Sequence, residues 1–117
     1  MQSKALKVLV VIPTYNEVDN VSPLIEGIGQ HAPDVDVLFV DDNSQDGTRQ
    51  KIADLQAKLP NRIHLLGRAG KLGLGTAYVE GFKWGMSRGY DVLVEMDADH
   101  SHRPEDLASI LQLAPNN

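Results

Sequence analysis

The sequence predicts an α/β fold: a Rossmann-like, mostly parallel sheet with helices on both faces. Short runs rich in β-branched residues alternate with stretches whose apolar residues recur at helical spacing. Because strands that alternate with helices pair in parallel through right-handed crossovers, this alternation indicates a sheet covered on both sides. The chain is long enough for one core and contains no repeat or internal linker, so we expect a single unit over residues 1–117.

Each predicted element follows from its own stretch of sequence. The strand-like runs, of which the third is the weakest, lie at residues 8–12, 35–40, 63–66 and 92–96. Helical spacing of apolar residues predicts helices that include residues 21–28, 52–59, 77–86 and 107–111. Pro104 suits the first turn of the last helix, because proline lacks the amide donor that would be unpaired there.

Composition excludes several classes of function. The net charge of -5 argues against broad affinity for nucleic acid or for anionic membrane surfaces. The chain has no cysteine, which excludes disulfides and thiolate chemistry and fits a reducing compartment, so we expect a cytoplasmic location. The longest apolar run, residues 8–12, is too short for a membrane span or a signal peptide.

Polar residues follow every predicted strand. The stretches after the strands read PTYNE, DDNSQDGT, GRAGKLGLGTA and DADHSH. In a parallel sheet of this kind, ligands bind beyond the carboxyl ends of the strands. The four stretches therefore predict one binding edge.

Asp97 and Asp99 close the fourth strand with one residue between them. Two carboxylates at this spacing can point the same way, and their hard oxygens suit Mg²⁺ or Mn²⁺ with a substrate diphosphate completing the coordination. The alternative is that both aspartates merely end the strand and cap a turn. His100 and His102 follow closely and are more typical of solvated side chains than of metal ligands.

The first two loops offer groups that suit a nucleotide. One of Asp41 and Asp42 could accept hydrogen bonds from a base or ribose while the other holds the loop. Tyr15 could stack on a base, or simply pack over the sheet edge. Glu17 is as well placed to cap the first helix as to contact a ligand.

The third loop, KLGLGTA, is a glycine-rich approach to a helix. A helix N-terminus favours phosphate, and Arg68 and Lys71 add positive charge nearby. The order of residues does not match a P-loop, and the loop follows the third strand instead of the first, which disfavours a dinucleotide fingerprint. Tight packing of the helix on the sheet is the alternative explanation of the glycines.

Four segments carry a resemblance to a known family: VVIPTYNE, VLFVDDNSQDGT, GLGTAYVEGF and VEMDADHSHRPEDL. In this order and spacing they resemble family 2 glycosyltransferases of the GT-A fold, and within them the polyprenol-phosphate and dolichol-phosphate mannosyltransferases. The resemblance covers most of the chain, about residues 7–113. It implies the N-terminal, donor-binding portion of such an enzyme.

The resemblance also implies a donor, a metal and the residues that bind them. The donor would be a nucleotide sugar, GDP-mannose by the nearest likeness, with Mg²⁺ or Mn²⁺ bound by Asp97 and Asp99 as the catalytic pair. Ser101 stands where many relatives carry a glutamine that is a further metal ligand. The residues implied around the nucleotide sugar are Pro13, Tyr15, Glu17, Asp42, Asp97, Ala98 and Asp99.

The acceptor can be considered from chemistry as well. A divalent ion stabilises a leaving nucleotide as a Lewis acid, whereas a sugar hydroxyl acceptor additionally needs a general base. A phosphate monoester, with a second pKa of about 6, is already mostly dianionic near neutral pH and needs none. The chain shows no obvious unassigned base, which is consistent with a phosphate acceptor. For the full-length parent the resemblance implies a polyprenyl phosphate acceptor, inversion at the sugar and a location at the cytoplasmic face of a membrane.

Other functions remain open at this point. A family 2 transferase that uses a UDP-sugar and a carbohydrate acceptor would share all the donor-side motifs. A phosphoacceptor receiver domain should have an aspartate closing its third strand, where this chain has Leu66, Gly67 and Arg68.

Family members of this type have a second half, so we expect residues 1–117 to be part of a longer domain. On their own, these residues could be a nucleotide-sugar-binding module without activity. With strand order 3-2-1-4 the fourth strand would be an exposed edge, so we also expect self-association or marginal stability.

Overall fold

The structure is a computed structural model that describes residues 6–70 and 73–98. Strands and helices alternate along these residues, as the sequence predicts. The strands are β1 (Val8–Thr14), β2 (Asp36–Asp41), β3 (Ile63–Gly67) and β4 (Val92–Glu95). The helices are α1 (Val18–His31), α2 (Thr48–Lys58) and α3 (Leu74–Ser87). The helix expected around residues 107–111 lies outside the described residues.

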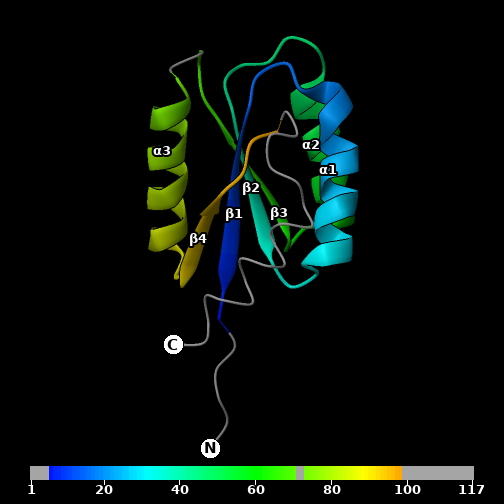
Figure 1. Ribbon diagram of the computed structural model, residues 1–117. Coiled ribbons are helices and arrows are strands. Elements are labelled where there is room, and N and C mark those ends of the chain that lie inside the picture. Colours follow the sequence, from blue (N-terminus) through cyan, green and yellow to red (C-terminus); the bar gives the residue numbers. More distant parts are fainter. Residues whose placement is uncertain (1–5, 71–72, 99–117) are drawn as a thin grey trace, which may run out of the picture.

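The strands form a parallel sheet in the order β3-β2-β1-β4 (Figure 1). β1 lies in the middle, where Leu9 pairs with Asp36 of β2 on one side and with Leu93 of β4 on the other. Parallel neighbours throughout the described residues confirm the predicted fold class. The expected order 3-2-1-4 is also confirmed, and it places β4 at one edge of this sheet.

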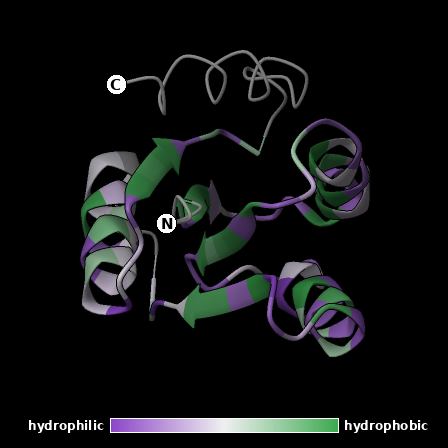
Figure 2. Cartoon of the chain, turned by 90° about the horizontal axis from the view of Figure 1, so that it is seen from below, coloured by the Kyte–Doolittle hydropathy of each residue, from purple (hydrophilic) through white to green (hydrophobic). Residues whose placement is uncertain are grey.

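Helices cover both faces of the sheet, with α1 and α2 on one side and α3 on the other (Figure 2). Successive residues of a strand point to opposite faces, so an uninterrupted apolar strand supplies both cores. In β1, Val10 and Ile12 belong to the core beneath α1 and α2, whereas Leu9 and Val11 belong to the core beneath α3. This double burial explains why the strands read as continuous apolar runs.

Gly81 allows helix α3 to pack directly against β1. A Cβ atom at Gly81 would lie 2.4 Å from Cγ1 of Val11, so only glycine fits there without movement. Tight packing was the alternative explanation for the glycines of the preceding loop, and for those in the described part it is wrong. At Gly73 and Gly75 an added Cβ would meet no described atom within 4 Å; Gly73 instead has a φ of 103°, which glycine adopts readily.

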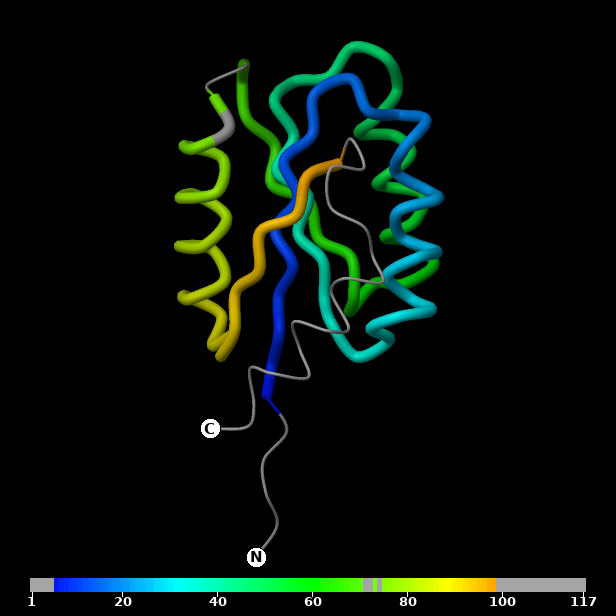
Figure 3. Tube along the Cα trace, viewed as in Figure 1, coloured from blue at the N-terminus to red at the C-terminus, as the bar shows by residue number. Residues whose placement is uncertain are grey.

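The carboxyl ends of the strands share one edge, and the β1–α1 and β2–α2 loops extend beyond it side by side (Figure 3). Backbone pairing continues into these loops, since the amide of Asp42 donates to the carbonyl of Thr14 at 3.0 Å. The amide of Arg68 donates likewise to the carbonyl of Asp41 at 2.8 Å. No helix in the described part of the chain is long and apolar enough to cross a membrane.

Candidate functional site

The first two loops at this edge are bound to each other. The amide of Asn16 donates to Ser44 Oγ at 2.7 Å, and the amide of Gln45 donates to Asn16 Oδ1 at 2.8 Å. Asn16 and Asn43 adopt left-handed backbone conformations, with φ of 55° and 59°, which asparagine tolerates better than most residues. The two loops therefore form one structural unit.

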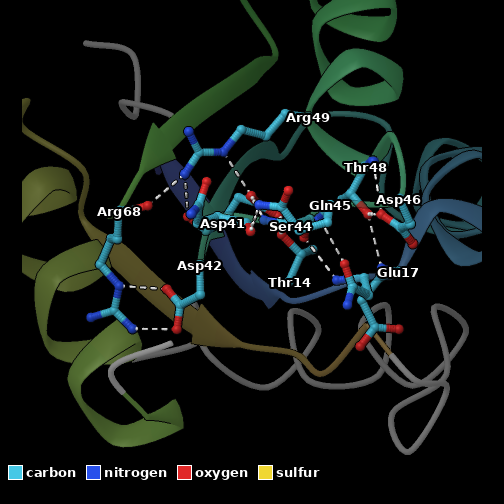
Figure 4. A network of polar contacts seen from close by, with 12 residues as sticks. Thr14, Glu17, Asp41, Asp42, Ser44, Gln45, Asp46, Thr48, Arg49 and Arg68 are labelled. Atoms are coloured by element: carbon cyan, nitrogen blue, oxygen red, sulfur yellow. Dashed lines mark hydrogen bonds and ion pairs between the residues drawn. The ribbon is translucent and has the colours of Figure 1, made fainter. Parts of the chain in front are cut away.

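Asp41 holds this unit together from inside (Figure 4). Its carboxylate is fully buried and accepts hydrogen bonds from the hydroxyls of Thr14 and Ser44, both at 2.6 Å, and from Arg49 Nε at 2.7 Å. Burial raises the pKa of Asp41, but the hydrogen bonds, chiefly those from Ser44 and Thr14, outweigh it and leave the pKa below its usual value. Of the two candidate aspartates, Asp41 is thus the one that holds the loop.

Asp46 caps α1 from the neighbouring loop, and this frees Glu17 from that role. Asp46 Oδ2 accepts from the amide of Val18 at 3.2 Å, and Thr48 Oγ1 accepts from the amide of Glu17 at 2.9 Å. Glu17 is the N-cap residue of α1 but makes no side-chain cap bond; its carboxylate accepts from Asn20 Nδ2 at 2.9 Å. The suggestion that the Glu17 side chain caps the helix is therefore wrong.

A cavity of about 210 Å³ lies beside these loops at the carboxyl edge. Its walls combine an exposed aromatic ring, carboxylates and small residues at the start of α3. The lining residues are Pro13, Thr14, Tyr15, Glu17, Asp42, Gly73 and Ala77. Four residues predicted to surround the nucleotide, Pro13, Tyr15, Glu17 and Asp42, thus line the same cavity, and Tyr15 is 40% exposed there.

Asp42 reaches this cavity while paired with Arg68. Arg68 donates from Nε to Asp42 Oδ1 at 2.6 Å and from Nη2 to Oδ2 at 2.8 Å, in a bidentate pair whose side chains are 3% and 8% exposed. Arg68 Nη1 also donates to Glu80 at 2.6 Å and to Thr76 Oγ1 at 3.0 Å. The hydrogen bonds with Asp42, more than any other influence, raise the pKa of Arg68 above its usual value.

This arrangement corrects the expectation for Arg68. Its positive charge was expected to favour phosphate near the start of α3, but two acidic side chains, Asp42 and Glu80, already pair with it. The guanidinium also donates to the carbonyl of Gly73 at 3.1 Å, so it ties β3 to the glycine at the start of α3. A ligand that bonds to Asp42 must therefore share this carboxylate with Arg68.

Asp97 lies beyond the end of β4, the strand that pairs with β1 on the side opposite β2. The amide of Met96 donates to the carbonyl of Val11 at 3.1 Å, which carries the strand pairing almost to Asp97. Tyr78 of α3 donates its hydroxyl to Asp97 Oδ1 at 2.6 Å, and the neighbouring Ala98 is buried. Asp97 and Ala98 are not part of the wall of the 210 Å³ cavity.

Several candidate residues cannot be placed. Asp99, Ser101, His100, His102 and Lys71 lie outside the described residues. In residues 6–70 and 73–98, no three acidic or histidine side chains gather as a metal site. The one described member of the predicted metal pair, Asp97, supplies the hard carboxylate oxygens that Mg²⁺ and Mn²⁺ prefer, so its chemistry fits either ion.

Three polar residues of this edge were missed from the sequence: Thr14, Arg49 and Tyr78. Each acts through another side chain, on Asp41 or on Asp97. The strand register would have revealed the first of these pairings, because Thr14 of β1 lies directly opposite Asp41 of β2.

Comparison with known proteins gives the family. Residues 9–117 match the family described as glycosyl transferase family 2. The chain belongs to glycosyltransferase family 2. It is 54% identical over 106 residues to polyprenol monophosphomannose synthase of Mycolicibacterium smegmatis, covering 90% of this chain and 40% of that protein. It is 50% identical over 107 residues to undecaprenyl-phosphate mannosyltransferase of Micrococcus luteus, covering 92% of this chain and 44% of that protein. The chain therefore spans less than half the length of these relatives.

Two solved structures share the fold. The mannosyltransferase PcManGT from Pyrobaculum calidifontis, in complex with GDP-Man and Mn²⁺, superposes with a TM-score of 0.69 at 24% identity. The match covers 80% of this chain and 27% of that one. S. aureus TarS 1-349 gives a TM-score of 0.64 at 22% identity over 92% of this chain and 32% of that one. These likenesses establish the GT-A type of α/β fold for the chain.

Proposed function

We propose that this family 2 chain carries the donor site of a metal-dependent polyprenyl-phosphate mannosyltransferase that uses GDP-mannose and inverts the anomeric centre. The observation that carries the proposal is the convergence of Pro13, Tyr15, Glu17 and Asp42 on one cavity at the carboxyl edge of the sheet. The names of two relatives that are at least 50% identical to the chain support the same acceptor class and the same sugar.

Different residues of the cavity would bind different parts of the nucleotide. The half-exposed ring of Tyr15 offers a face on which a base stacks, and Asp42, held in place by Arg68, accepts hydrogen bonds from the base edge or the ribose. Because the loops that carry both residues are locked by Asp41, these groups are already in position before the nucleotide arrives. Preorganisation of this kind lowers the cost of binding.

Asp97 and Asp99 would hold the divalent ion, and a bound ion supplies Lewis-acid stabilisation of the leaving diphosphate. The protein contributes position: Asp97 follows a strand paired with β1, and β1 itself ends in the cavity wall at Pro13 and Thr14. A polyprenyl phosphate brings its own negative charge to the reaction and requires no general base from these residues. The lipid tail of this acceptor implies that the full-length protein works at a membrane surface, and the family resemblance implies the cytoplasmic face.

Calorimetric competition between nucleotides tests the donor assignment. The chain is titrated with GDP-mannose, with GDP and with UDP in the presence of Mn²⁺, and we expect the guanine compounds to bind at least tenfold more tightly. Preference for UDP would favour a family 2 transferase with a UDP-sugar donor. Absence of binding by the folded chain would refute a donor site within these residues.

Incubation with GDP-mannose and undecaprenyl phosphate tests the transfer. A β-linked mannosyl phospholipid, identified by NMR, is the product that inversion predicts from the α-linked donor. Tight donor binding with no transfer would instead identify residues 1–117 as a binding module.

A further inference from the structure

A hydrogen bond links α3 to the first aspartate of the predicted metal pair. The Tyr78 hydroxyl donates to Asp97 Oδ1 at 2.6 Å, a short distance typical of a hydroxyl that donates to an ionised carboxylate. Tyr78 is only 9% exposed, so this bond is made at the buried side of Asp97. Tyr78 also follows Ala77, which lines the cavity, so the start of α3 joins the cavity to the end of β4.

Both partners of this bond are anchored through the same residue of β1. On the carboxylate side, the carbonyl of Val11 accepts from the amide of Met96, immediately before Asp97. On the tyrosine side, Gly81 lies one helical turn beyond Tyr78 and sits directly against the Val11 side chain. The Tyr78 ring packs in the core beneath α3, with its centroid 6.2 Å from that of Phe82. The hydroxyl and the carboxylate are therefore held in a fixed mutual position.

We propose that Tyr78 is the positioning residue for Asp97: its hydroxyl holds the carboxylate in the orientation that receives the divalent ion. The inference rests on the proposed function, in which Asp97 is a metal ligand. A ligating carboxylate that is hydrogen-bonded by a fixed partner meets the ion in one orientation, and loss of such partners typically weakens metal binding by about 10–100-fold. Tyr78 acts through Asp97 and has no chemical step of its own.

The substitution Tyr78→Phe tests this role because it removes one oxygen and keeps the buried ring. The chain offers a matched control in Tyr90, whose hydroxyl donates to Asp36 Oδ2 at 2.6 Å. Asp36 begins β2, so this second tyrosine–aspartate bond lies at the opposite end of the sheet from the site. Tyr90→Phe therefore removes the same kind of hydrogen bond from the same domain without touching Asp97.

Mn²⁺ is titrated into each variant in the presence of GDP, and free Mn²⁺ is followed by electron paramagnetic resonance. We expect Tyr78→Phe to weaken Mn²⁺ binding by about 10–100-fold, and Tyr90→Phe to leave it unchanged. GDP binding in EDTA is measured in parallel, and we expect both variants to match the original chain. If Tyr78 has only a structural role, Tyr78→Phe should weaken Mn²⁺ binding and GDP binding together, or should have the same effect on Mn²⁺ binding as Tyr90→Phe.

Asp97→Asn separates a failure of this inference from a failure of the function on which it rests. If Asp97→Asn abolishes Mn²⁺ binding while Tyr78→Phe binds Mn²⁺ as tightly as the original chain, or more tightly, the positioning role is refuted and the metal site stands. If Asp97→Asn binds Mn²⁺ unchanged, Asp97 is not a ligand and both proposals are overturned.

Discussion

The buried pair of Asp42 and Arg68 gives the sharpest prediction for stability. Arg68→Met removes the guanidinium but keeps a long apolar side chain, so Asp42 is left as a charge with no bidentate partner. Breaking a buried ion pair from one side typically costs about 3–5 kcal/mol. Because Asp42 also borders an open cavity, water can solvate it in part, and we expect the lower end, about 3 kcal/mol.

Arg49 provides the matched control on the neighbouring aspartate. Its Nε donates to the Asp41 carboxylate at 2.7 Å, and its Nη2 donates to the carbonyls of Asp41 and Arg68 at 3.0 and 2.6 Å. The Arg49 side chain is 38% exposed, so water can replace these bonds in part, and Asp41 keeps its hydrogen bonds from Thr14 and Ser44 when the arginine is lost. We therefore expect Arg49→Met to cost only about 1.5 kcal/mol, the lower end for a hydrogen bond to a charged group. Urea denaturation followed by circular dichroism gives the free energy of unfolding of each variant.

A double-mutant cycle identifies the cause of the loss. In Asp42→Asn/Arg68→Met the buried charge that has lost Arg68 is removed as well, so this double variant should be more stable than Arg68→Met alone. The prediction is refuted if Arg68→Met costs less than about 1 kcal/mol. It is also refuted if the loss in the double variant equals the sum of the losses in Asp42→Asn and Arg68→Met.

Three further predictions concern the rest of the molecule. Gly81→Ala places a methyl group against Val11 and should lower the free energy of unfolding by about 1–3 kcal/mol. Gly29→Ala, where the new methyl group meets open space on α1, should raise it by up to about 1 kcal/mol. Equal effects of the two substitutions in urea denaturation would contradict the close packing of α3. The ring centroids of His64 and Trp84 are 5.0 Å apart, and Nε2 of His64 is buried with no hydrogen-bond partner in the described structure. Burial lowers the pKa of His64, so the folded state disfavours its charged form. Stability should therefore fall as the pH drops below the unfolded pKa of about 6.5, and a His64→Phe chain with the same slope would refute this assignment. Finally, β4 is an edge of the described sheet, so we expect concentration-dependent association by light scattering, and a monomer at all concentrations would count against it.

The fold was predictable because buried apolar residues recur at helical spacing in the helices and form short continuous runs in the strands. The apolar runs and the helical spacing identify every element of the described part, and the polar stretches after the strands locate the binding edge. The chemistry of the loops indicates Tyr15, Glu17 and Asp42, and the resemblance to family 2 adds Pro13; all four line one cavity. Their part in nucleotide binding stays a prediction.

Pairings between elements were not predictable in the same way. Periodicity shows that a side chain is buried but not which residue it meets, because the partner depends on register and on how closely a helix approaches. The sequence therefore indicates positive charge at Arg68 and a helix at Tyr78, but it shows neither the pairing of Arg68 with Asp42 nor the hydrogen bond of Tyr78 to Asp97. The close packing of α3 against Val11 depends on Gly81 and not on the glycines of the preceding loop. This packing sets the position of Tyr78.

The central claim is that these residues bind a nucleotide sugar through a divalent ion held by Asp97 and Asp99. The most direct measurement is calorimetric titration of GDP-mannose into the chain with Mn²⁺ and with EDTA, repeated for Asp97→Asn and Asp99→Asn. Both substitutions are close in size to aspartate, so the fold, checked by circular dichroism, should be retained. We expect binding that Mn²⁺ strengthens and that each substitution returns to the level seen in EDTA. Binding that is equally tight in EDTA, or unchanged in both variants, would contradict the claim.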